Sequence, residues 1–154
     1  MSKSTKTITQ AVLDYLATTL LVGDNVECRR AYLPVADVEE LELLGKPLVV
    51  VCPVDRKAEP VNRGNTLRQQ WSIDIAVNAK LKHRNDLSSL LTDEIDELIG
   101  LLEKIHDSFI HCVIGGNGNE TRIVCTQPKH LIFCDMEMIM EYNCFLGVVR
   151  ASVE

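Results

Sequence analysis

Two unusually long stretches of the chain alternate apolar and polar residues. The first places Trp71, Ile73, Ile75, Val77, Ala79 and Leu81 at every second position, and the second does so with Ile132, Cys134, Met136, Met138, Met140, Tyr142, Cys144, Leu146 and Val148. Successive side chains of a strand point to opposite faces, so each stretch is predicted to be a strand with one buried and one solvated face. Both strands would be about two to three times the usual length. Strands this long either bend strongly or project beyond their domain, which points to contact with another chain.

Helical spacing of apolar residues predicts two amphipathic helices. The first covers residues 7–21 and stops before Gly23, and the second covers residues 86–110 with Asp86 as its N-cap. The outer face of the second helix is acidic: it carries Asp93, Glu94, Asp96, Glu97, Glu103 and Asp107 against one Lys104.

Shorter elements connect these segments. Strands are predicted over Val26–Leu33 and Leu48–Cys52, each ended by a proline, and residues 37–41 form either a short helix or a turn. Residues 115–119 are predicted to be a glycine-rich loop, and residues 122–126 are able to pair with a neighbouring strand.

A basic loop is predicted between the Leu48–Cys52 strand and the first long strand, which would make these two a long β-hairpin. Residues 53–70 carry four cations against two carboxylates: Arg56, Lys57, Arg63 and Arg68 against Asp55 and Glu59. These four cations are candidates for contact with a neighbouring subunit or a partner.

The order of the elements predicts an α+β fold in a single domain over residues 1–154. We expect a two-layer sandwich whose mostly antiparallel sheet lays one face against the two amphipathic helices. The other face of the sheet would be polar, with Asp74, Asp135, Glu137 and Glu141 exposed on it.

Composition and charge restrict the classes of protein to which the chain could belong. The 154 residues carry a net charge of −6, which argues against a general nucleic-acid-binding surface. No apolar run approaches the roughly 18–20 residues that cross a bilayer, and the N-terminal segment has helical spacing rather than that of a signal peptide. Six cysteines without a Cys-x-x-Cys pair indicate buried thiols in a reducing cytoplasm.

Searches for catalytic motifs point away from an enzyme. Leu44-Gly45-Lys46-Pro47 lacks the upstream glycine and the hydroxyl residue of a phosphate-binding loop. Five residues could converge on a metal, but their spacing matches no zinc pattern: His106, His111, Cys112, Cys125 and His130. A Cys112/His130 nucleophile pair has nothing nearby to depress the thiol pKa. Paired carboxylates on the sheet could bind a divalent cation, but a solvated face is the commoner arrangement. We expect no catalytic residue, metal or cofactor.

Several segments together resemble the neck and tail-completion proteins of long-tailed bacteriophages, a group similar in fold to tail terminators. The segments are Arg30-Ala31-Tyr32-Leu33-Pro34 followed by residues 37–41, Val49-Val50-Val51-Cys52-Pro53, the Arg63-Gly64 turn, Ile73-Asp74-Ile75-Ala76-Val77, Ile95-Asp96 to Leu102, and Pro128-Lys129-His130-Leu131. The likeness covers about residues 8–150, and the cysteines and methionines of the final segment depart from the usual pattern.

The resemblance implies a virion structural protein that assembles in the bacterial cytoplasm into a ring, expected to be hexameric. Its partners would be further copies of itself, the tail tube protein and the head–tail connector protein. DNA would pass through the ring without specific binding, past an acidic lumen face that repels phosphates. A head-side connector or stopper ring is the alternative, and a small metal-dependent enzyme using the acidic sheet face is a further one.

Overall fold

The computed structural model describes residues 3–60, 67–83, 89–110, 112–115, 122–125, 130–132 and 135–154. Its elements along the chain are α1 (Thr5–Tyr15), the π-helical turn η1 (Leu16–Leu20), β1 (Glu27–Arg30), α2 (Val38–Leu44), β2 (Leu48–Pro60), β3 (Leu67–Lys80), α3 (Ser89–Ser108), β4 (Val113–Ile114), β5 (Ile123–Val124), β6 (His130–Ile132), α4 (Met136–Tyr142) and β7 (Cys144–Val153). The predicted α+β class is confirmed. Both amphipathic helices are confirmed as well, although the proposed cap Asp86 lies outside the described residues.

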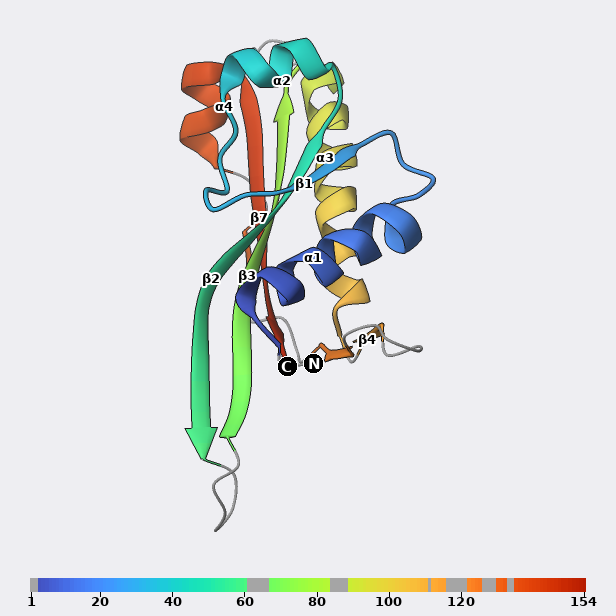
Figure 1. Cartoon of the computed structure of the whole chain (residues 1–154). Helices are drawn as coiled ribbons and strands as arrows, with labels where there is room; N and C mark the ends of the chain where they lie inside the picture. The colour runs from blue at the N-terminus through green and yellow to red at the C-terminus, as the bar shows by residue number, and fades with distance from the viewer. Residues whose placement is uncertain are drawn as a thin grey trace.

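The sheet is mostly antiparallel, as predicted. Within the described residues, its strands follow the order β1-β2-β3-β7-β6, and β4 and β5 form a separate pair. Strand β1 runs parallel to β2, whereas the β2–β3, β3–β7 and β6–β7 pairs are antiparallel. Figure 1 shows the β2–β3 hairpin extending well beyond the other strands at one end of the sheet.

One face of the sheet packs against α1 and α3. The apolar sides of both helices join the main core, where Ile8 and Val12 of α1 and Leu102 and Ile105 of α3 are fully buried. The strands contribute Trp71, Ile73, Ile75, Val77 and Ala79 from β3, together with Val149, Ala151 and Val153 from β7. The first predicted alternation therefore places its apolar side chains in this core.

The opposite face of the sheet is covered near one end, which the sequence did not predict. A second buried cluster joins Leu41 of α2 to Leu48, Val50, Ala76, Cys144 and Leu146 of the sheet, with Met138 of α4 packed against it. Helices α2 and α4 lie over this end in Figure 1. The structure therefore does not confirm a two-layer sandwich, and the expected solvated face is wrong here.

Asn78 shows how a polar residue of the supposed wet face becomes buried. Its side chain is 1% exposed. The amide oxygen accepts from the Ala36 N–H at 3.1 Å, and the amide nitrogen donates to the Pro34 carbonyl at 2.8 Å. Asn78 thus satisfies the backbone of the 34–36 segment, which runs across the sheet into α2.

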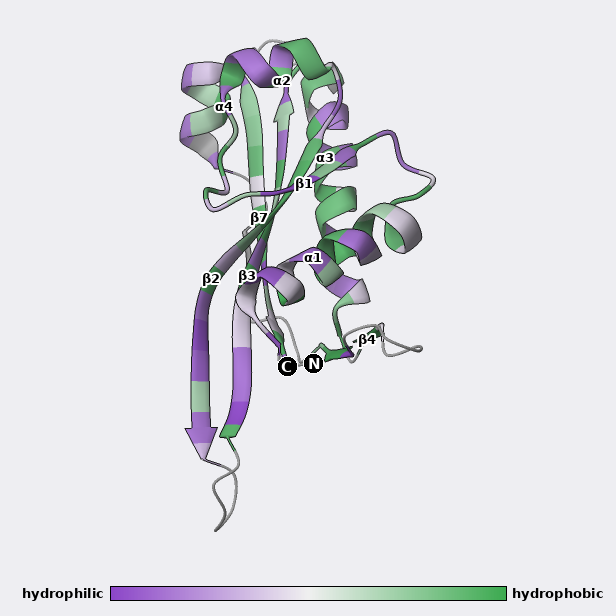
Figure 2. Ribbon diagram, in the orientation of Figure 1, coloured by the Kyte–Doolittle hydropathy of each residue, from purple (hydrophilic) through white to green (hydrophobic). Residues whose placement is uncertain are grey.

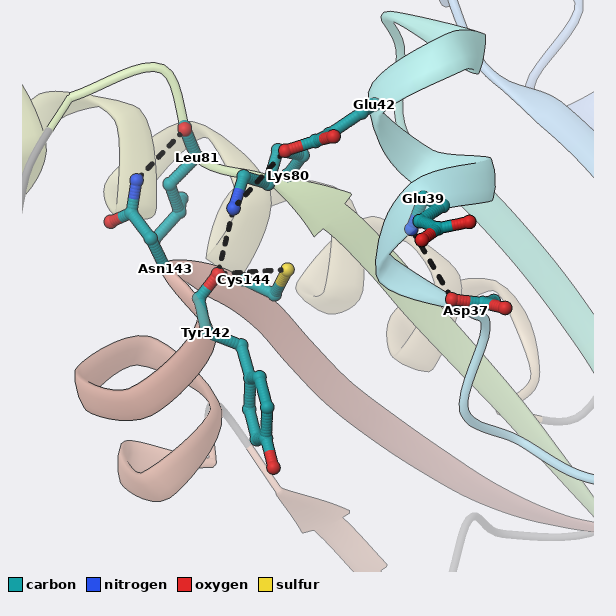
Figure 3. A network of polar contacts seen from close by, with 8 residues as sticks. All are labelled: Asp37, Glu39, Glu42, Lys80, Leu81, Tyr142, Asn143 and Cys144. Carbon is teal, nitrogen blue, oxygen red and sulfur yellow. Dashed lines mark hydrogen bonds and ion pairs between the residues drawn. The ribbon is translucent and has the colours of Figure 1, made fainter.

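The second long strand was wrongly predicted. Residues 136–142 form α4, and the strand begins only at Cys144. Asp135 caps the helix by accepting from the Glu137 and Met138 N–H groups, and Asn143 ends it in the left-handed conformation with φ 52°. Asn143 also donates to the Leu81 carbonyl at 3.1 Å (Figure 3). The two caps favour a helix between them, and over only seven residues an alternating pattern is compatible with a helix as well as with a strand.

The predicted basic loop is largely a strand. Strand β2 continues to Pro60 and pairs with β3 as far as Leu67, with a shift of register between Pro53 and Asp55. Both prolines occupy tolerated positions, because Pro53 lies at the bulge and Pro60 at the strand end. The long hairpin is therefore confirmed, and residues 61–66 at its tip lie outside the described residues.

Candidate functional site

The projecting part of the hairpin is the most distinctive surface of the molecule. We call residues 54–60 of β2 and 67–70 of β3 the arm. All of them are exposed except Gln70, which is half-buried. The arm is hydrophilic over most of its length, in contrast to the apolar strands of the body (Figure 2). It is a two-stranded ribbon, because β1 pairs with β2 only as far as Val51 and β7 pairs with β3 only from Trp71.

The predicted contact cations lie on strands of the arm rather than in a loop. Arg56 is opposite Trp71 and Lys57 is opposite Gln70, so these two neighbours point to opposite faces of the ribbon. Neither has an ion-pair partner within the described residues. Arg63 lies outside the described residues.

Arg68, the fourth predicted contact residue, is engaged within the chain. Its guanidinium donates through Nε to a Glu154 carboxylate oxygen at 2.8 Å and forms an ion pair with the same oxygen through Nη2. Hydrogen bonding to Glu154 raises the pKa of Arg68 above its ordinary value. The pair ties the β3 strand of the arm to the residue that follows β7, which makes Arg68 a weaker candidate for contact than Arg56 or Lys57.

Asp74 does not offer a free carboxylate to solvent. Arg150 on the neighbouring β7 donates to it twice, from Nε to Oδ1 at 2.7 Å and from Nη2 to Oδ2 at 3.0 Å. The Asp74 side chain is only 11% exposed, against 45% for Arg150. Hydrogen bonding to Asp74 raises the pKa of Arg150, and the charge of Asp55 contributes to a smaller degree.

The other three residues of the predicted acidic face lie elsewhere. Asp135 caps α4, and Glu137 and Glu141 are exposed on that helix rather than on the sheet. The four carboxylates therefore do not form one sheet face, because the segment that carries three of them is not a strand. The uncovered sheet face instead has mixed charge, with Asp74 neutralised by Arg150.

The acidic face of α3 is confirmed. Its exposed carboxylates follow helical spacing along one side: Asp93, Asp96, Glu97, Glu103 and Asp107. Glu94 is not part of this face, because it accepts from the Lys82 backbone N–H at 2.7 Å and contacts His83 Nδ1 at 2.6 Å. Lys104 on the same side pairs with Asp24 at 2.8 Å.

Exposed apolar side chains lie at the end of the molecule opposite the arm, and the sequence did not predict them. Leu43 of α2 is 91% exposed, and Met140 and Tyr142 of α4 are exposed as well. Lys80 links the two helices by pairing with Glu42 at 3.7 Å and donating to the Tyr142 carbonyl at 2.8 Å (Figure 3). The sequence predicted Met140 and Tyr142 to lie among the apolar positions of a strand, and their exposure follows from the unforeseen α4.

Of the five candidate metal residues, the structure describes the side chains of His106, Cys112 and Cys125, and these three do not form a metal site. Within the described ranges, no group of three or more His, Cys, Asp and Glu side chains could hold a metal ion. His111 and the side chain of His130 lie outside the described part. Cys125 is 1% exposed, and burial raises its pKa to about 12, so at neutral pH it is a thiol rather than a nucleophilic thiolate.

No family model matches the chain, and no curated protein matches it. Among the described residues, no helix is both long enough and apolar enough to span a membrane.

Proposed function

We propose that this chain is a structural protein of a long-tailed bacteriophage virion. Copies of it form a ring at the head–tail junction, which caps the tail tube and docks it to the head connector. The observation that carries the proposal is the arm: a paired ribbon that leaves its own domain and is exposed on both faces. The resemblance of the sequence to tail-completion proteins supports the same assignment.

The physical reason concerns the stability of isolated ribbons. Two strands without further packing are marginal in water, so the arm gains order when another chain covers it. A contact between the arm of one copy and a different surface of the next is heterologous, and such contacts close into rings when the rotation between copies allows. The arm also has features that limit indiscriminate edge pairing, namely the bulge where it begins, Pro60 at its strand end, and charged side chains.

The proposal that DNA passes without specific binding now has a different physical basis from the acidic lumen face expected from the sequence. The acidic sheet face does not form, so repulsion of DNA depends on the overall charge of −6 rather than on one carboxylate-lined surface. The proposed structural role is unchanged by this revision, because it rests on the arm rather than on the sheet carboxylates.

Electron microscopy of the purified chain, alone and mixed with tail tubes, tests the proposal. We expect rings that bind the end of the tube and stop its growth. Rings that bind portal complexes instead of tubes would favour the head-side connector or stopper. Particles that bind neither would overturn the virion assignment.

A further inference from the structure

The arm carries positive charges that the rest of the chain does not neutralise. Arg56 and Lys57 are adjacent on β2, exposed, and without ion-pair partners among the described residues. Because their side chains leave opposite faces of the ribbon, they flank the open edge of β2, where β1 no longer pairs. A rod-shaped element laid along this edge would meet both cations at once.

The outer face of α3 carries the complementary charge. Asp93, Asp96 and Glu97 are exposed, and none has a cationic partner in the described part of the chain. Asp96 and Glu97 follow Asp93 by three and four residues, spacings at which like charges on a helix repel each other and destabilise it. A cationic partner would offset this repulsion.

Gly100 is a second, independent feature of the same face that indicates contact with another chain. It is exposed in the middle of α3, where glycine costs about 1 kcal/mol relative to alanine. A Cβ built at this position meets nothing within 4 Å, so packing within the chain does not require a glycine. A missing side chain on an exposed helix face does, however, let another backbone approach closely.

These two surfaces cannot meet within one chain. Glu94 holds the beginning of α3 at the end of β3, through the Lys82 N–H, whereas Arg56 lies opposite Trp71 at the other end of that strand. At about 3.3 Å per residue, the stretch from Trp71 to Lys80 spans about 30 Å. Figure 1 shows the arm pointing away from α3.

We propose that the β2 edge of the arm docks on the outer face of α3 of a second copy of this chain. Arg56 and Lys57 pair there with Asp93, Asp96 and Glu97, and Gly100 admits the strand edge. The inference rests on the proposed ring and supplies its repeating contact, because each copy offers one arm and one helix. Such a contact is heterologous and propagates around a ring.

Two charge-reversal variants test the contact by sedimentation velocity at low salt, over a wide range of protein concentration. Arg56→Glu with Lys57→Glu reverses the arm, and Asp96→Lys with Glu97→Lys reverses the helix. We expect each variant alone to associate at least about tenfold more weakly than the wild type, because like charges then face each other. An equimolar mixture should assemble again, because each reversed surface then meets its opposite on the other variant.

Matched controls separate this contact from net charge. Lys6→Glu with Lys46→Glu changes the charge as the arm variant does, and Glu137→Lys with Glu141→Lys changes it as the helix variant does. Both controls should assemble as the wild type does. Gly100→Gln should raise the melting temperature of the monomer and weaken association, a combination that a merely structural glycine would not give.

The outcomes distinguish this inference from the proposed function. The arm–helix contact would be overturned if both reversed variants assembled as strongly as the wild type. It would also be overturned if their mixture stayed monomeric while the wild type assembled. Neither result would contradict the proposed ring. A wild type that stays monomeric at every concentration would overturn the contact as a driver of self-association. The tube-capping experiment would then still decide the proposed function.

Discussion

Asp74→Asn tests the charge pair that replaces the predicted acidic face. The substitution keeps the shape of the side chain and removes its charge. The amide oxygen can still accept from Arg150, but the amide nitrogen cannot, so the ion pair and one of the two hydrogen bonds are lost. Hydrogen bonds of this kind contribute about 1.5–3 kcal/mol, and breaking a fully buried ion pair costs about 3–5 kcal/mol.

The partial exposure of Arg150 reduces that cost. Its side chain is 45% exposed, so water solvates the orphaned guanidinium and screens the pair. We therefore expect Asp74→Asn to lower the free energy of unfolding by about 1–2 kcal/mol. For a domain of this size, the melting temperature should fall by about 2–8 °C. Arg150→Met should cost more, because it leaves the less exposed partner, Asp74, charged and unpaired.

Urea denaturation followed by fluorescence gives the measurement. Trp71 is the single tryptophan, is 1% exposed and lies on the same strand as Asp74, so its emission reports unfolding of the core directly. Asp55→Asn is the matched control: it removes an exposed carboxylate from the same sheet face and should change the stability by no more than about 0.5 kcal/mol.

The double variant decides whether the pair itself is responsible. Combining Asp74→Asn with Arg150→Met should cost less than the sum of the single variants, with a coupling of about 1 kcal/mol. Additive effects, or an Asp74→Asn variant as stable as Asp55→Asn, would refute the view that Arg150 neutralises Asp74.

Three further predictions concern stability. Burial raises the pKa of Cys125 to about 12, so the unfolded thiol ionises first as the pH rises above about 9; wild type should lose about 1 kcal/mol between pH 7 and 10 that Cys125→Ala does not lose, measured by urea titration at both pH values. Asn78→Leu should cost about 2 kcal/mol, because it leaves the Ala36 N–H and the Pro34 carbonyl buried without their partner, and should speed amide exchange at Ala36. Asn143→Ala should lower the melting temperature more than Asn143→Gly, since both lose the bond to Leu81 but only alanine is strained at φ 52°.

Helix α3 and strand β3 were predictable from sequence because many residues in each agree on one period. The apolar stripe of α3 extends over five helical turns, and the alternation of β3 over more than ten residues. The alternation of β3 was also correct about direction, since Trp71, Ile73 and Ile75 all face the main core.

The alternation over residues 132–148 failed although it is longer than the first one. The seven residues that form α4 within it read Met-Glu-Met-Ile-Met-Glu-Tyr, and over so short a stretch strand and helix patterns overlap. The decisive information lay in the flanking residues, Asp135 as N-cap and Asn143 as C-cap, and both can be read from the sequence.

The covered sheet face could not be inferred locally. Asn78 looks like a solvent-facing residue, and its partners Pro34 and Ala36 lie 44 and 42 residues earlier in the chain. Likewise, the pairing of Asp74 with Arg150 joins residues 76 positions apart. Side chains that are neutralised by such distant partners are indistinguishable, in sequence, from those that are free.

Charged side chains that have partners within the chain contribute to its folding, and those without such partners are available for assembly. Asp74, Arg150, Arg68 and Glu154 satisfy one another and belong to the stability of the body. Arg56 and Lys57 contribute to no core cluster and no ion pair among the described residues, so their reversal should leave the melting temperature within about 2 °C of the wild type. An assembly defect in the arm variant would then be a defect of contact. A large loss of stability would instead show that the arm packs on its own body, which would remove the basis for docking between copies.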